Sequence, residues 1–175
     1  MAPPYAQLEA ELTLILSGLD SSQTQLKPPA APQKWSVQQI VEHLLLSYRG
    51  TYGTIQQRID KGTPTKGSPS LIQRLGQFAI MTLGQFPTGR AAPLAVVPPA
   101  NSSACDGKEL IGFVHEALAD LTRQASEAER LFGTQRFASH LILGPLSLSQ
   151  WSRFHLIHGR HHLRQIQAIQ QAHPG

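Results

Sequence analysis

The sequence predicts an all-α fold, an up-down-type four-helix bundle with a short extra helix and a long proline-rich loop. Three observations support this prediction. Apolar residues recur at intervals of three and four along most of the chain, as they do on the buried face of an amphipathic helix. Polar residues typical of helix starts precede the long periodic stretches. No stretch shows the apolar and polar alternation of a half-buried strand.

The first two long helices are predicted on either side of a proline-rich loop. Apolar residues from Tyr5 to Leu19 follow the helical period, whereas segment 27–34 is rich in proline and is predicted to be a loop. Ser36 and Gln39 then have the spacing of a capping box, in which each side chain bonds to the other residue's backbone amide. We expect the second helix to run from this box to about Lys61, because a glycine follows there as a stop signal.

The remaining chain is predicted to add one short and two long helices. The short helix covers Pro69 to about Gln85, and a long irregular segment with four prolines extends from Phe86 to Gly107. Such a segment is most often a simple surface loop, although long loops in compact domains also form pocket walls. One long helix is expected from Asp106 to about Arg130, followed by a connection at 131–145. The last helix begins at Ser147 and runs to about Ala172.

Length and composition restrict the class of protein. The 175 residues suffice for one domain with its own core, so residues 1–175 are predicted to be a single domain. The net charge of +4 comes from scattered lysines and arginines, which argues against a nucleic-acid partner. The one cysteine, Cys105, excludes an internal disulfide, and an incidental thiol is favoured over a nucleophile because no base is identifiable. We expect a cytoplasmic protein with no membrane partner, because neither a signal peptide nor a membrane-spanning stretch is recognisable.

The predicted last helix carries four histidines within eight residues: His155, His158, His161 and His162. In a helix His158 and His162 lie one turn apart on one face, where two imidazoles can bind one divalent ion. Hydrogen-bonded core histidines would give the same pattern. A metal site needs a third ligand. The candidates are His155 on the same face and His43, which lies on the flank of the apolar stripe of the second long helix.

Two regions of the chain together resemble the DinB/YfiT-like superfamily of metal-binding four-helix bundles. The first is the Trp-Ser opening of the second long helix, which precedes a histidine by seven or eight positions. The second is the last helix with its His-x-x-x-His-x-x-Gln pattern. The residues that carry the resemblance are Trp35 to Leu44, and Gly144 to Trp151 continuing to His158, His162 and Gln165.

The resemblance implies that His43, His158 and His162 bind a divalent metal ion. It also implies that Gln165 supports a ligand or packs beside it, and that the other two histidines of the cluster line the pocket or have structural roles. Nickel, zinc, iron and manganese all accept imidazole nitrogen, so the ligands do not identify the ion. Three neutral imidazoles would leave the full charge of the ion uncompensated, which favours an anion or hydroxide as a further ligand.

The resemblance implies less about the reaction than about the metal. Some members resemble thiol-dependent S-transferases, and others look like hydrolases or isomerases. A divalent ion held by three histidines lowers the pKa of a bound water or thiol and supplies a nucleophile for attack on a small electrophile. One hypothesis is therefore a metal-dependent enzyme with a small-molecule substrate, for which a low-molecular-weight thiol is one candidate. The other is a non-catalytic metal-binding or stress-related bundle. A homodimer is compatible with both.

Overall fold

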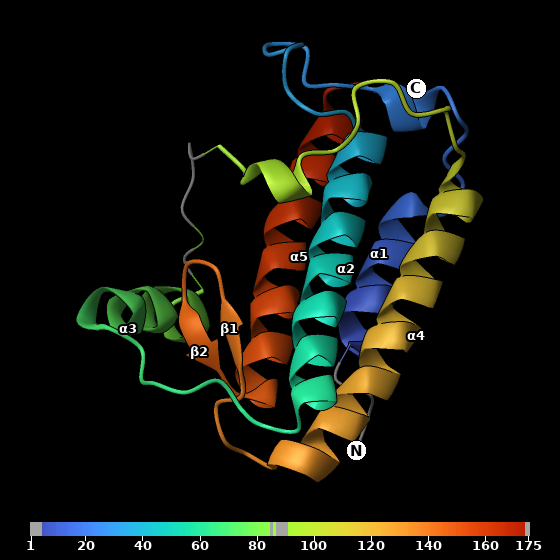
Figure 1. The fold of residues 1–175 in the computed structure, drawn as a ribbon. Coiled ribbons are helices and arrows are strands. Elements are labelled where there is room, and N and C mark those ends of the chain that lie inside the picture. Colours follow the sequence, from blue (N-terminus) through green and yellow to red (C-terminus); the bar gives the residue numbers. More distant parts are fainter. Residues whose placement is uncertain (1–4, 85, 87–90, 174–175) are drawn as a thin grey trace.

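A computed structural model describes residues 5–84, 86 and 91–173, and its architecture is the predicted all-α bundle (Figure 1). Four long helices form the bundle, and a short helix stands to one side of it. The bundle helices are α1 (Ala6–Leu16), α2 (Val37–Lys61), α4 (Gly107–Phe132) and α5 (Leu148–Gln171), and the short helix is α3 (Leu71–Gln77).

The helix directions follow from the connection between α2 and α4. Gln38, near the start of α2, hydrogen-bonds to the backbone of Ser103 and Cys105 just before α4, and Gln124 of α4 donates to Gln56 near the end of α2. These two helices therefore run parallel. The connection has to cross the length of the bundle, and it carries α3, a π-helical turn η2 (Phe78–Thr82) and a short 3-10 turn η3 (Leu94–Val96).

The antiparallel pairs of the bundle are α1 with α4 and α2 with α5. Leu19, just after α1, accepts a hydrogen bond from Gly107 at the start of α4. Across α2 and α5, His43 lies beside His158 and Thr51 lies beside His155. The up-down-type arrangement thus applies to these pairs, whereas α1 and α5 run in the same direction (Figure 1).

Helix starts agree with the predicted signals. The capping box of Ser36 and Gln39 is formed, and α2 ends at Gly62, whose φ of 61° is a left-handed conformation suited to glycine. Asp106 and Ser147 cap α4 and α5 in the same reciprocal way. The helix expected at 69–85 is α3 followed directly by η2, and Gln85 lies outside the described residues.

One element was not predicted. Within the connection at 131–145, β1 (Ala138–His140) pairs in antiparallel fashion with β2 (Gly144–Leu146), with Ala138 opposite Leu146. Strands of three residues are too short to show alternation in the sequence. The hairpin packs against α3 through Gln77, whose side-chain amide donates to the carbonyl of Leu143.

The helix α3 is turned with its polar side toward the protein. Gln77 is buried against the hairpin, whereas the larger apolar side chains of this segment are exposed. These exposed residues are Leu71, Ile72, Leu75 and Phe78, with exposed fractions from 55% to 83%. The four long helices enclose the main apolar core, which includes the fully buried Leu12, Leu44 and Leu121. None of the helices described here has the length and apolar character needed to cross a membrane.

Candidate metal centre

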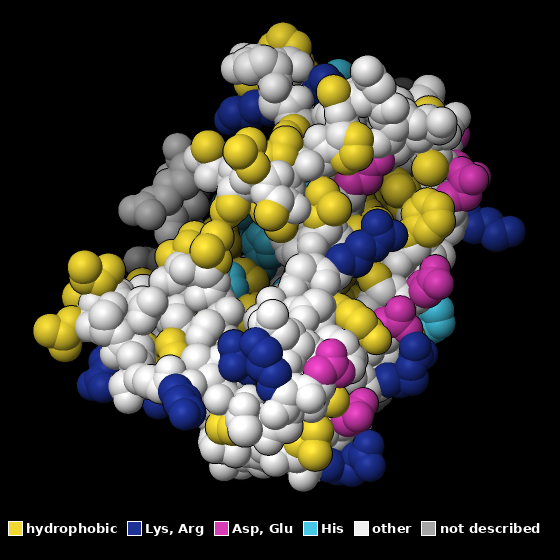
Figure 2. Space-filling view, viewed as in Figure 1, with side chains coloured by type: hydrophobic (Ala, Val, Ile, Leu, Met, Phe, Trp, Pro, Cys, Tyr) yellow, Lys and Arg dark blue, Asp and Glu magenta, His cyan; other side chains and the backbone are white. Residues whose placement is uncertain are grey.

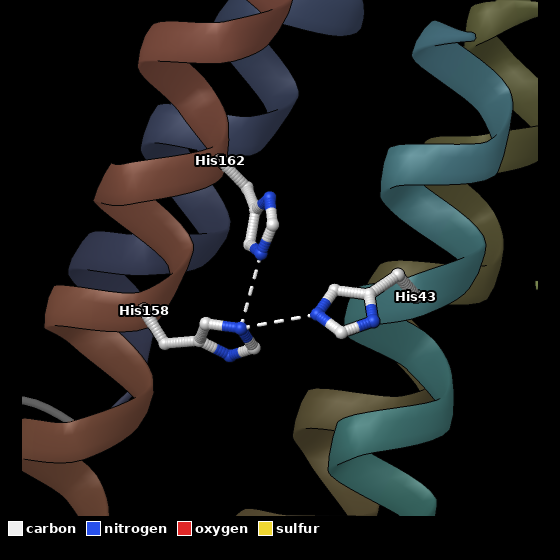
Figure 3. Close-up of side chains that lie close together, drawn as sticks. All are labelled: His43, His158 and His162. Carbon is white, nitrogen blue, oxygen red and sulfur yellow. Dashed lines mark hydrogen bonds between the residues drawn. The ribbon is translucent and has the colours of Figure 1, made fainter. Parts of the chain in front are cut away.

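The structure brings the three predicted ligands together, His43 from α2 and the pair His158 and His162 from α5 (Figure 3). The Nε2 atom of His158 lies 3.1 Å from the Nε2 atoms of both other histidines, and the candidate ligand atoms are all within 4.8 Å of one another. Each side chain is only 5–6% exposed. The flank position of His43 on α2 is the side that faces the antiparallel α5.

The spacing of these nitrogens suits a single metal ion. Metal–nitrogen bonds of about 2.0–2.1 Å at tetrahedral angles separate two ligand nitrogens by about 3.3 Å. The two separations of 3.1 Å from His158 are close to this value. In the part of the chain that the structure describes, no aspartate or glutamate hydrogen-bonds to these histidines, so the ligand set is wholly imidazole.

Hydrogen bonds on the far side of two rings orient their lone pairs toward the centre. The Nδ1 atom of His43 lies 2.7 Å from the carbonyl oxygen of Val96, and the Nδ1 atom of His162 lies 2.8 Å from Oε1 of Gln165. A carbonyl oxygen can only accept, so both Nδ1 atoms carry the hydrogen and both Nε2 atoms carry a lone pair. Nε2 of His158 can donate to only one of them. Without a metal, the Nε2 lone pair of the other histidine would face Nε2 of His158 with no hydrogen between them. A cation placed between the three nitrogens would accept these lone pairs and remove this unfavourable contact.

Aromatic packing holds the rings that form these contacts. Phe86 and Phe154 stack on His158, with ring centroids 4.9 and 5.4 Å away and interplanar angles of 22° and 23°. Trp35 packs on His43 at a centroid distance of 4.9 Å. The buried Nδ1 atom of His158 has no hydrogen-bond partner among the described residues, so packing alone holds this ring on its Nδ1 side.

Burial keeps the three imidazoles neutral. It lowers the pKa of His162 to about 3, with a further contribution from the nearby His43. Burial also holds the pKa of His158 well below its usual range, and the neighbouring histidines add to this effect. The pKa of His43 is lowered by burial and partly restored by its bond to the Val96 carbonyl. Neutral imidazole is the form that binds a metal, so the site is ready for one without prior loss of protons.

The other histidines of the α5 cluster lie outside the ligand set. His155 is completely buried, its Nε2 atom lies 3.0 Å from Oγ1 of Thr51, and burial lowers its pKa to about 3. His155 therefore has a structural role, which is one of the two roles, pocket-lining or structural, that the resemblance implies for it. His161 is partly exposed and lies beside the site, where its Nε2 atom accepts a hydrogen bond of 3.1 Å from the Gln165 amide. Gln165 therefore links His161 to the candidate ligand His162.

Among the described residues, the side chains of Cys105, Tyr52 and Arg49 form no hydrogen bond to the three candidate ligands. Burial and nearby carboxylates raise the pKa of the Cys105 thiol, which is the opposite of what an activated nucleophile needs. Tyr52 is 39% exposed and lines a groove between α2 and α4 with Asp120 and Arg123. Arg49 is exposed on α2.

Two contacts with the ligands come from the irregular segment, and the sequence did not identify them individually. Phe86 stacks on one candidate ligand, His158, and the backbone carbonyl of Val96 in η3 fixes the tautomer of another, His43. Of the two alternatives for this segment, a simple surface loop and a pocket wall, these two contacts favour the second. A backbone carbonyl leaves no sequence signal, because any residue type supplies it.

A protein-family model matches most of the chain. Residues 5–166 match the DinB superfamily, and this range includes α1, α2 and α4, most of α5 and the three candidate ligands. No curated protein and no solved structure matches the chain significantly.

Proposed function

This chain belongs to the DinB superfamily of metal-binding proteins, and we propose that it is an enzyme in which His43, His158 and His162 hold a divalent metal ion. The ion would activate a thiol or water for attack on a small electrophile, as in an S-transferase or a hydrolase. One observation carries the metal site. The acceptors at Val96 and Gln165 turn two Nε2 lone pairs toward the point that the third imidazole also reaches.

The chemistry depends on how the protein holds this site. A divalent ion with an open coordination position lowers the pKa of a bound water or thiol and supplies a nucleophile near neutral pH. The protein contributes three fixed neutral ligands, which is the number found in catalytic zinc sites that keep a position open. The aromatic rings of Phe86 and Trp35 exclude water from the sides of the ligands.

Metal analysis of purified protein tests the ligand set. The wild-type chain, loaded with zinc or cobalt and then desalted, should retain about one ion per chain. His43→Ala, His158→Ala and His162→Ala should each lose it. His115→Ala is a matched control, because the side chain of His115 is 69% exposed on α4 and pairs with Glu9. Retention of stoichiometric metal after His43→Ala would contradict the proposed triad.

A second measurement separates the enzyme from a non-catalytic metal-binding bundle. The visible spectrum of the cobalt-loaded protein should change when azide or a low-molecular-weight thiol is added, because these enter an exchangeable position. Turnover of small electrophiles with a panel of thiols should then be lost after treatment with a chelator. If no added ligand alters the cobalt spectrum, the position is closed, and the catalytic proposal fails although the metal site stands.

A further inference from the structure

Exposed apolar side chains lie next to the points where the irregular segment contacts the metal ligands. In η3 the carbonyl of Val96 contacts His43, while Leu94 is 93% exposed and the adjacent Val97 is 41% exposed. Phe86, from the same irregular segment, stacks on the ring of His158. Histidine side chains are visible in a hollow beside these elements, and much of its rim is hydrophobic (Figure 2).

The charges around this opening are unbalanced. The ligands are three neutral imidazoles with no carboxylate bonded to them among the described residues, so a bound divalent ion would keep its full charge of about +2. The exposed Arg164 adds a further positive charge near His161. An anion is therefore favoured in the open position, and the exposed side chains of Leu94 and Val97 on the η3 side of the site are apolar.

We infer that the substrate at the open position is an amphipathic anion, whose thiolate or carboxylate head binds the metal and whose apolar chain lies over Phe86, Leu94 and Val97. This inference rests on the proposed function, because it assigns a substrate class to the same site. Covering a side chain as exposed as Leu94 with an apolar ligand removes apolar surface from water, which makes binding more favourable. A fully buried methylene increases affinity about fourfold, and an open rim buries roughly half of it, so about twofold per methylene is expected.

A homologous series of ligands measures this contribution directly. The cobalt-loaded full-length protein is titrated with straight-chain carboxylates from acetate to octanoate, and binding is followed by the cobalt absorption spectrum rather than by activity. We expect the dissociation constant to fall about twofold per methylene, roughly 60-fold over the six added methylenes. The cobalt signal reports only binding at the metal, so attachment of octanoate elsewhere on the surface does not contribute.

Variants test whether the rim residues supply the effect. Changing Leu94→Ser together with Val97→Ser should flatten the dependence on chain length while leaving acetate binding within about twofold of wild type. Leu71→Ser is the matched control, because Leu71 is 78% exposed but lies on α3. It should keep the wild-type dependence.

The outcomes separate this inference from the proposed function. Equal affinity for all chain lengths, or an unchanged dependence in the Leu94 and Val97 double variant, would overturn the amphipathic substrate and leave the exchangeable metal position intact. If neither carboxylates nor thiols alter the cobalt spectrum of the wild-type protein, the proposed function and this inference both fail.

Discussion

Gln165 is expected to set the metal affinity of the site although it does not bind the ion. Its Oε1 atom accepts the hydrogen of Nδ1 of His162 at 2.8 Å and thereby keeps the lone pair of Nε2 directed at the metal position. Gln165→Leu removes this acceptor with little change in volume. Gln165→Glu retains an acceptor and makes it negative, which strengthens the bond to the Nδ1 hydrogen.

The size of the effect follows from the exposure of Gln165. Loss of such a supporting hydrogen bond typically weakens metal binding about 10- to 100-fold. Because Gln165 is exposed, water can replace part of the lost bond. We therefore expect Gln165→Leu to weaken zinc binding about tenfold, or about 1.4 kcal/mol. Gln165→Glu should bind zinc at least as tightly as the wild-type protein.

Competition with a chromophoric chelator at pH 7 measures these affinities. Gln167→Leu is the control, because Gln167 is an exposed glutamine on the same helix, two residues further along. It should bind zinc like the wild-type protein. The reasoning is refuted if Gln165→Leu matches the control, since His162 would then keep its orientation without this acceptor.

Further predictions concern pH, packing and assembly. Nδ1 of His140 accepts backbone hydrogen bonds in the hairpin turn. Burial lowers the pKa of His140 from 6.5 to about 4. The contribution of neutral His140 to stability is therefore complete above pH 6.5 and is lost as the pH falls toward 4. Urea unfolding of the metal-free protein measures how far the free energy of unfolding falls between pH 7 and pH 4.5. This fall should be about 2.5 kcal/mol smaller in His140→Asn than in the wild type, and an equal fall in both would contradict the prediction. Gly159→Ala should lower the free energy of unfolding by about 1–3 kcal/mol, because the added Cβ would clash with the buried side chain of Leu8 in α1. Gly112→Ala, with no atom within 4 Å of its Cβ, should raise it by about 0.5–1 kcal/mol in the same thermal or urea unfolding experiment. If the chain forms a homodimer through the exposed apolar face of α3, Leu75→Lys should give a monomer in sedimentation, whereas Leu131→Lys on α4 should not. An unchanged dimer in Leu75→Lys would exclude that face.

The parts of the fold that the sequence predicts well are those controlled by local hydrogen bonds. Capping at Ser36, Asp106 and Ser147 needs only residues three positions apart, and all three helix starts are where these residues predict them. The hairpin depends on contacts across the fold instead, including the bond from Gln77 to the carbonyl of Leu143. The sequence also did not predict that the apolar face of α3 points outward, because periodicity locates an apolar stripe without showing what covers it.

For the candidate metal centre, the sequence likewise predicts part of the side-chain contribution and none of the backbone contribution. The spacing of His158 and His162 indicates a pair on one face, but helical periodicity places His43 only on a flank, and the resemblance to a known family was needed to select it. Its supporting acceptor is the carbonyl of Val96, which belongs to the irregular segment and has no side-chain signature. Metal affinity and the position of η3 are therefore linked. Displacing η3 from α2 removes the acceptor that fixes the tautomer of His43, and should weaken metal binding by the same 10- to 100-fold range as loss of a supporting side chain.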